Sequence, residues 1–183
     1  MSKRPNPWKT LEVRDVYDNP WISVTEHRVI DPNGAPAIYG KISMKNQAIG
    51  IIPTDTAGNT WLVGQYRYTL DAWSWEIPMG GSPAGESPLE TAKRELREET
   101  GLAATHWEQI LRLHTSNCVT DEEGFVFLAQ QLTEGEPCFD ETEQLEIRKL
   151  PLSDALEMAV AGEITDALSV AGLLALARRA ERG

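Results

Sequence analysis

Residues 80–102 read GGSPAGESPLETAKRELREETGL, and they predict a helix over residues 88–100. Ser87 and Glu90 form a capping box around a proline at the first helical position, and Gly101 is of the type that commonly ends a helix in a left-handed conformation. At 100° per residue, the buried stripe of this helix consists of Leu89, Ala92 and Leu96. The local sequence therefore predicts both ends of the helix and its buried side.

Three acids lie at the edge of the buried stripe. Glu95, Glu98 and Glu99 are three and four residues apart, which places their like charges on one side of the helix. A solvated charged face is the ordinary interpretation of such a group. Two features oppose it. The acids lie toward the C-terminal end, where the helix dipole disfavours negative charge, and residues 78–85 are rich in glycine and proline, as expected of backbone that approaches a ligand closely.

Composition excludes several classes of protein. The chain has 183 residues, a net charge of −11, 41% apolar and 25% charged residues, which suits one globular domain with a sizeable core. No segment approaches the roughly 20 apolar residues that span a bilayer, and no apolar stretch follows the basic N-terminus, so we expect a cytoplasmic protein without a membrane partner. No basic patch is visible, which argues against nucleic-acid binding. An anionic substrate would instead require a divalent cation held by carboxylates of the protein.

Turn signals divide the rest of the chain into short segments. β-Branched and aromatic residues between these signals predict strands at 10–17, 21–30, 36–44, 47–54 and 60–68. A loop rich in Trp, Pro and Gly follows, and after the helix we expect strands at 108–114, 124–132 and 145–150. Two helices close the chain, one beginning after Ser153 and one over 166–180 with Thr165 as N-cap. This order suggests an α/β sandwich whose sheet is covered on both faces.

The spacing across residues 80–102 resembles the Nudix box of the Nudix hydrolases. Gly80, Glu86 and the run RELREETGL at 94–102 fill every fixed position of that long pattern. The resemblance implies an α/β/α sandwich with a mixed sheet, preceded by an N-terminal antiparallel β segment. We expect residues 1–45 to be a dimerisation layer and residues 46–183 to form the Nudix hydrolase domain. Nudix enzymes hydrolyse a nucleoside diphosphate linked to another moiety, using Mg²⁺ or Mn²⁺ held by the box.

The chemistry of that reaction explains the acids. A pyrophosphate carries negative charge that repels an incoming water, and metal ions neutralise the phosphoryl oxygens as the bond breaks. Mg²⁺ is a hard ion with oxygen ligands, so Glu95 and Glu99, one helical turn apart, can share it, with Glu98 nearby. The resemblance assigns these three glutamates as metal ligands and adds the backbone carbonyl of Met79.

Arg94 is the basic residue inside the box. We expect it to position a carboxylate, most simply that of Glu98 one turn on, while the resemblance makes Glu86 either a neighbour of the metal ligands or a peripheral ligand itself. A pair with Glu90 is the purely structural alternative for Arg94.

Two flanking segments narrow the family. QYRY at 65–68 and WEIPMGG at 75–81 resemble the ADP-ribose pyrophosphatase and nucleoside-diphosphate-sugar hydrolase branch, in which the arginine and glutamate at these positions contact substrate. Arg67 is thus expected to bind phosphate and Glu76 to accept from a ribose or base edge, and a base could stack on Trp75. An ordinary strand-end ion pair is the alternative for Arg67.

The general base must lie outside the box if metal occupies its acids. The loop DETE at 140–143 resembles the late catalytic loop of the ADP-ribose pyrophosphatases, which implies Glu141 as base and Glu143 as an additional metal ligand. The acidic residues 121–123 and Glu98 are the competing candidates, because sequence cannot show which acid reaches the attacking water.

These inferences predict one enzyme with two alternatives. NPWISV at 19–24 resembles the strands that pair two subunits in this branch, so we expect a homodimer with each site near the partner. We predict hydrolysis of the pyrophosphate bond of ADP-ribose or a related sugar nucleotide, since TSNC at 115–118 lacks the proline typical of ADP-ribose-specific members. Nucleoside triphosphates or dinucleoside polyphosphates are the alternative substrates. A noncatalytic sugar-nucleotide sensor is the alternative class, and the complete box argues against it.

Overall fold

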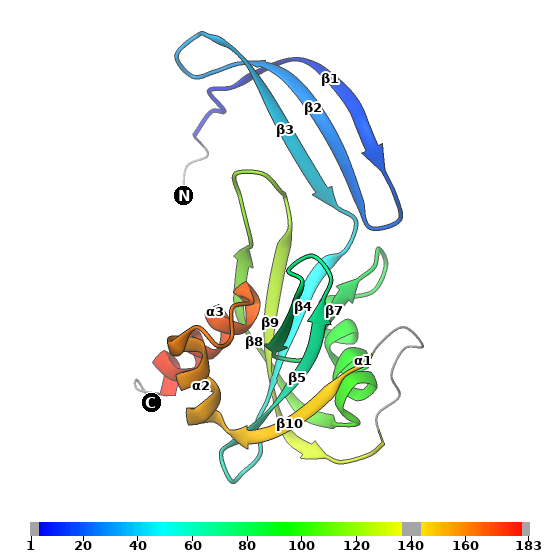
Figure 1. Ribbon diagram of the computed structural model, residues 1–183, viewed down its shortest axis with the longest axis vertical. Helices are drawn as coiled ribbons and strands as arrows, with labels where there is room; N and C mark the ends of the chain where they lie inside the picture. The colour runs from blue at the N-terminus through cyan, green and yellow to red at the C-terminus, as the bar shows by residue number, and fades with distance from the viewer. Residues whose placement is uncertain (1–3, 137–143, 181–183) are drawn as a thin grey trace. The chain divides into compact units, whose positions relative to one another are not determined.

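The structure is a computed structural model that describes residues 4–136 and 144–180 (Figure 1). By their internal contacts the described residues form two compact units. The first contains residues up to 46 together with 116–122, and the second contains residues 47–115 and the chain from 123 onward.

The first unit is an antiparallel sheet of three strands. Its strands run in the order β1 (Lys9–Asp18), β2 (Ile22–Ile30) and β3 (Pro36–Met44). The turn between β2 and β3 is held by Asp31, whose Oδ1 accepts hydrogen bonds from the amides of Asn33 and Ala35. The N-terminal antiparallel β segment predicted from the sequence is confirmed, with bounds that differ by no more than a residue or two at each end.

The second unit contains a mixed sheet and a smaller antiparallel one. The mixed sheet has the order β7 (Met79–Ser82), β4 (Gln47–Pro53), β9 (Glu123–Thr133) and β8 (Ala103–His114), in which β4 and β9 are parallel. The smaller sheet has the order β10 (Glu146–Pro151), β5 (Asn59–Arg67) and β6 (Ala72–Glu76). The prediction of a loop between β5 and the box was wrong in part, because β6 and β7 are strands there.

Three helices complete the second unit, namely α1 (Pro88–Thr100), α2 (Leu152–Ala161) and α3 (Ala167–Ala180). α1 has the predicted bounds, both bonds of its capping box are present, and Gly101 ends it with φ of 72°. Thr165 was wrongly predicted as the N-cap of α3, because Oδ2 of Asp166 accepts the amide of Ser169 at 2.8 Å. No helix among the described residues is long and apolar enough to cross a membrane.

Helices cover both faces of the mixed sheet, as Figure 1 shows for α1 on one side and α2 and α3 on the other. β4 alternates its side chains between two hydrophobic cores. Ile49 and Ile51 pack with Leu96 of α1, whereas Ile52 packs with Leu168 of α3 in the second core. Gly172 lets α3 approach the sheet, because a Cβ there would lie 3.0 Å from Cγ1 of Val126. The predicted α/β/α sandwich with a mixed sheet is confirmed.

Candidate active site

Arg94 on α1 gathers three carboxylates around one guanidinium. Its Nε and Nη2 donate to the two oxygens of Glu86 at 3.2 and 3.0 Å, and its Nη1 donates to Oε1 of Glu95 at 2.7 Å and Oε2 of Glu98 at 3.0 Å. The hydrogen bond to Glu86 is the largest cause that raises the pKa of Arg94, and the hydrogen bonds to Glu95 and Glu98 add to it. The predicted pair with Glu98 is present, and Glu90 instead accepts from the amide and hydroxyl of Ser87 in the capping box.

Glu86 is held from two sides. Besides Arg94, the hydroxyl of Thr91 donates to its Oε2 at 2.9 Å. The Arg94 hydrogen bond and then the Thr91 hydrogen bond hold the pKa of Glu86 below its ordinary value. Thr91 was missed by sequence reasoning, because its place in the buried first half of α1 gave no sign that the loop before the helix returns to it.

Glu99 lies in the interior of the second unit. Its relative exposure is only 2%, and its Oε2 accepts a hydrogen bond from the amide of Met79 at 2.9 Å. The sequence resemblance had assigned the carbonyl of Met79 to metal, whereas the structure shows what its amide does. A buried carboxylate requires such donors, since an uncompensated charge is expensive to bury.

The backbone at Gly80 lies against Glu95. A Cβ built on Gly80 would overlap the carboxylate of Glu95, so a side chain at this position is incompatible with that placement of the acid. The glycine of the box therefore has a steric role that is independent of its backbone conformation.

The donor set fits a hard divalent cation in its chemistry. Glu95 and Glu98 present oxygens to a single cationic atom, Nη1 of Arg94, and the buried Glu99 carboxylate lies on the same helix. Within residues 4–136 and 144–180 no three acidic, histidine or cysteine side chains already converge as a ligand cluster. A cation at this site would therefore share its carboxylates with Arg94 and with the Met79 amide.

Gly80→Ala is expected to lower kcat/KM by roughly 10- to 100-fold, because the new methyl group displaces the Glu95 carboxylate. That carboxylate is the end of a flexible side chain, so the protein should still fold. Gly40→Ala is the matched control, since a Cβ at Gly40 meets nothing within 4 Å. Steady-state kinetics and thermal unfolding of both variants test this, and wild-type kinetics for Gly80→Ala would contradict it.

The predicted substrate-binding residues pair with each other. Nε of Arg67 donates to Oε1 of Glu76 at 2.9 Å and Nη2 donates to the other oxygen, across the strands β5 and β6. The hydrogen bond to Glu76, which is 2% exposed, raises the pKa of Arg67. Trp75 packs edge-to-face on Trp73 with centroids 6.0 Å apart. The ion-pair alternative for Arg67 thus describes this structure.

The competing base candidates at 121–123 include two structural acids. Asp121 accepts from Nζ of Lys41 and the hydroxyl of Ser43, each at 2.8 Å. Glu123 forms an ion pair with Arg112 and accepts from Gln47 at 3.0 Å. Glu141 and Glu143, the predicted base and additional ligand, lie outside the described residues.

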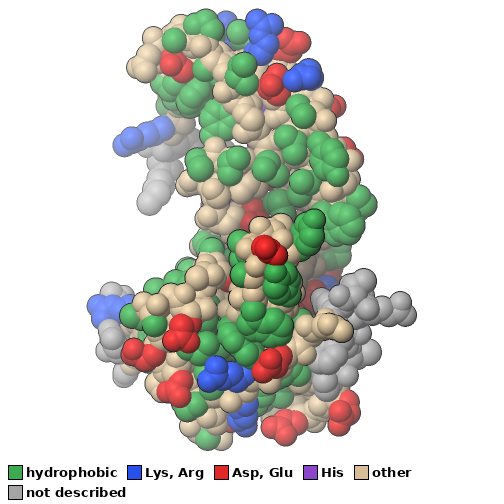
Figure 2. Space-filling view, viewed as in Figure 1, with side chains coloured by type: hydrophobic (Ala, Val, Ile, Leu, Met, Phe, Trp, Pro, Cys, Tyr) green, Lys and Arg blue, Asp and Glu red, His purple; other side chains and the backbone are tan. Residues whose placement is uncertain are grey.

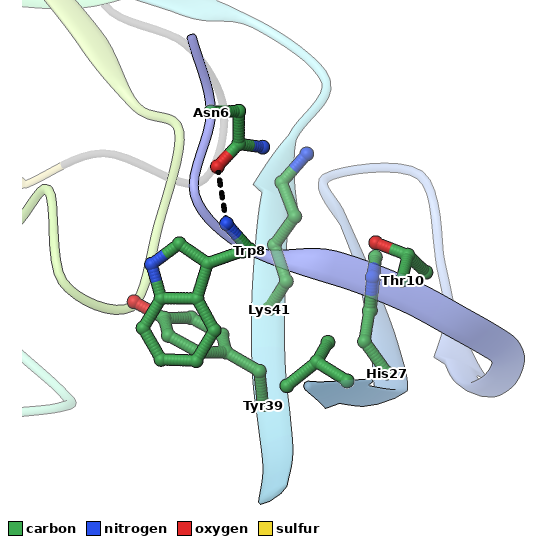
Figure 3. Close-up of a pocket in the computed structure, with 7 residues that line it drawn as sticks. Asn6, Trp8, Thr10, His27, Tyr39 and Lys41 are labelled. Atoms are coloured by element: carbon green, nitrogen blue, oxygen red, sulfur yellow. Dashed lines mark hydrogen bonds between the residues drawn. The ribbon is translucent and has the colours of Figure 1, made fainter. Parts of the chain in front are cut away.

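The first unit has a hollow that is lined by aromatic and polar side chains, among them those of Trp8, Tyr39 and His27 (Figure 3). Trp8 packs edge-to-face on Tyr39, with ring centroids 5.6 Å apart, and its amide donates to Asn6 at 3.0 Å. The hydroxyl of Tyr39 donates to the carbonyl of Cys118 at 2.7 Å, and His27 bonds Thr25 at 2.9 Å. These polar groups have partners within the unit.

The fold and the acidic helix define the class of protein, a Nudix-type α/β/α sandwich. The chain belongs to the Nudix family, since the model of the NUDIX domain matches residues 44–168. A second family model, described as the nucleoside diphosphate sugar hydrolase N-terminal domain, matches residues 8–42.

The names of similar proteins are consistent with membership of this family. The chain is 39% identical over 132 residues to an ADP-ribose pyrophosphatase of Mycobacterium tuberculosis, an alignment that covers 70% of this chain and 64% of the relative. It is 34% identical over 161 residues to an ADP-ribose pyrophosphatase of Bacillus subtilis, which covers 87% and 86%. A crystal structure of an ADP compounds hydrolase has the same fold, with a TM-score of 0.86, 22% identity, and coverage of 98% and 97%. The chain is accordingly a Nudix pyrophosphohydrolase.

Proposed function

We propose that the protein hydrolyses the pyrophosphate bond of a nucleoside diphosphate sugar, ADP-ribose or a related compound, to a nucleoside monophosphate and a sugar phosphate. The observation that carries the proposal is the arrangement around Arg94, in which the oxygens of Glu95 and Glu98 meet one cationic atom on the helix that also carries the buried Glu99. Such a concentration of carboxylates serves to hold positive charge against an anionic substrate.

The residues of the chain have separate roles in this proposal. Glu95, Glu98, Glu99 and the Met79 carbonyl would hold Mg²⁺, or Mn²⁺ in its place, which would neutralise charge on the phosphoryl oxygens. Nudix hydrolases generally use a divalent metal. Arg94 holds Glu95 and Glu98 toward one point, and Gly80 leaves room for the carboxylate of Glu95.

The substrate class is supported by the relatives and by the N-terminal family model. Two relatives carry the name ADP-ribose pyrophosphatase, and residues 8–42 match a domain named for nucleoside diphosphate sugar hydrolases. In this structure Arg67 is paired with Glu76, so binding of a phosphate by Arg67 would require the guanidinium to add an acceptor or to exchange Glu76 for it.

A panel of nucleotides tests the substrate class. We expect release of nucleoside monophosphate from ADP-ribose or another sugar nucleotide in the presence of Mg²⁺. Nucleoside triphosphates and dinucleoside polyphosphates are the competing arms of the panel, and turnover of these alone would overturn the assignment.

The proposed homodimer rests on the surface of the first unit. Every residue of β1 is exposed, and large apolar side chains of the first unit are open to solvent on β1, on β3 and in the turn between β1 and β2, among them Leu11, Val13, Val16, Tyr17, Trp21 and Ile38. Figure 2 shows hydrophobic side chains gathered over these strands. Exposed apolar side chains in this number are typical of an interaction surface, and we propose a second copy of the chain as the partner of this sheet.

Light scattering should therefore give twice the 20.3 kDa chain mass. Ile38, which is 71% exposed, offers a test position, because Ile38→Glu places a charge at an exposed apolar position of the sheet without disturbing a core. We expect this variant to shift toward monomer, whereas Glu12→Gln, a polar change on the same sheet, should not. A wild-type monomer with full activity at assay concentration would count against the dimer.

A further inference from the structure

Three successive residues, Ile77 and Pro78 between β6 and β7 and Met79 at the start of β7, are held by three different elements. The amide of Ile77 donates to the hydroxyl of Ser169 on α3 at 3.0 Å. The carbonyl of Pro78 accepts from the amide of Ile51 on β4 at 2.8 Å, and the amide of Met79 donates to Glu99 on α1. The backbone is therefore held by a hydrogen bond at each of residues 77 and 78, and at Met79, whose amide binds Glu99.

Ser169 is the most distant of these partners in sequence and is fully buried, with 0% exposure. Its hydroxyl donates its single proton to Oδ2 of Asp166 at 2.8 Å, and the same carboxylate oxygen caps α3 by accepting the amide of Ser169. Because the proton is committed to Asp166, the lone pairs of the hydroxyl are available to the amide of Ile77. Asp166 thus sets the direction in which Ser169 bonds.

We propose that Ser169 is a positioning residue that fixes residues 77–79 and thereby the carboxylate of Glu99. The inference rests on the proposed function, in which Glu99 is a metal ligand. Groups that hydrogen-bond a metal ligand influence the affinity for the metal, because they set the orientation of the ligand before the metal binds. Ser169 does this at one remove, through the backbone whose Met79 amide bonds Glu99.

The electrostatics agree that α3 begins close to the site. After the dominant hydrogen bond to Glu76, the charges of Asp166 and Glu99 both contribute to raising the pKa of Arg67. The guanidinium of Arg67 therefore lies within electrostatic range of Asp166 at the N-terminus of α3 and of Glu99 near the end of α1. Sequence reasoning missed this role of Ser169, although the Asp-x-x-Ser spacing at 166–169 is a local signal for a helix cap.

Binding of Mn²⁺ alone, followed by the loss of the free-ion electron paramagnetic resonance signal, tests the inference without nucleotide or turnover. Ser169→Ala leaves the buried amide of Ile77 without its acceptor, and we expect the Kd for Mn²⁺ to rise by roughly 10- to 100-fold. The kcat should fall with little change in the KM for substrate. Leu173→Val is the matched control, because it loosens the same core from the same helix but keeps the Ser169 hydroxyl that accepts the amide of Ile77.

Each outcome decides between accounts. Ser169→Ala with wild-type Mn²⁺ affinity would overturn the positioning role and leave the proposed function standing, whereas a wild-type protein that binds no Mn²⁺ would overturn both. An equal loss of Mn²⁺ affinity in Leu173→Val would also overturn the positioning role, since general loosening of the core would then explain the loss. Should Ser169→Ala not fold, Asp166→Ala carries the same test, and we expect a smaller rise in Kd because the hydroxyl remains.

Discussion

Glu99→Gln is expected to reduce kcat by about 10³-fold while the protein remains folded. A metal ligand supports several kcal/mol of charge stabilisation in the transition state, and about 4 kcal/mol corresponds to that loss in rate. The fold should survive because the amide oxygen of glutamine can still accept the hydrogen bond from Met79. Removal of a charge that is 2% exposed also relieves a burial cost, so the unfolding temperature should stay level or rise.

Glu90→Gln is the matched control for this variant. It makes the same chemical change on the same helix, and glutamine preserves the capping box with Ser87. Its kcat should remain at the wild-type value. Kinetics at saturating Mg²⁺ and thermal unfolding of both variants provide the measurement. If Glu99→Gln kept near-normal kcat, Glu99 would not be a metal ligand.

Glu141→Gln is expected to lower kcat by roughly 10²–10⁴-fold, the usual scale of general base catalysis, with a smaller change in KM. Glutamine cannot take the proton of the attacking water, yet it keeps the size of the side chain. Glu143→Gln should instead weaken metal affinity. Kinetics under saturating Mg²⁺ separate the two effects.

The described residues sharpen the comparison with the other base candidates. Partial burial would raise the pKa of Asp121, but hydrogen bonds from Lys41, Ser43 and the Met44 amide outweigh it and lower that pKa, which makes Asp121 a weak base. Glu123 is engaged by Arg112. We therefore expect Asp121→Asn and Glu123→Gln to affect kcat less than Glu141→Gln. A collapse of kcat in one of them, with Glu141→Gln near normal, would move the base to the earlier loop.

The parts of the fold with local signals were predictable from the sequence. α1 begins and ends as predicted because its capping box and Gly101 act over four or five residues. β7, with the sequence MGGS, has poor intrinsic strand propensity and exists because it pairs with β4, Met79 opposite Gly50. Asp166 and Thr165 are both capping residue types, and the choice between them follows from the packing of α3, which no local pattern reports.

The contacts of the candidate site also divide into those that local spacing predicts and those that depend on the tertiary fold. The acids on α1 and the pair of Arg94 with Glu98 follow from helical spacing. The bond of Arg94 to Glu86 depends on a loop that folds back. The pair of Arg67 with Glu76 depends on β5 and β6 being neighbours. The sequence places Glu99 at the edge of the buried stripe, whereas the side chain is nearly inaccessible and its hydrogen-bond donor is Met79, the first residue of the unpredicted strand β7.

Hydrolysis of ADP-ribose in ¹⁸O-labelled water tests the central claim most directly. With Mg²⁺ present, the account predicts AMP and ribose 5-phosphate in equal amounts, with one labelled oxygen in the phosphate of one product and no products in excess chelator. The Glu99→Gln variant should form them only at its reduced rate. Undiminished turnover in chelator, or no cleavage of any sugar nucleotide with Mg²⁺, would contradict the account.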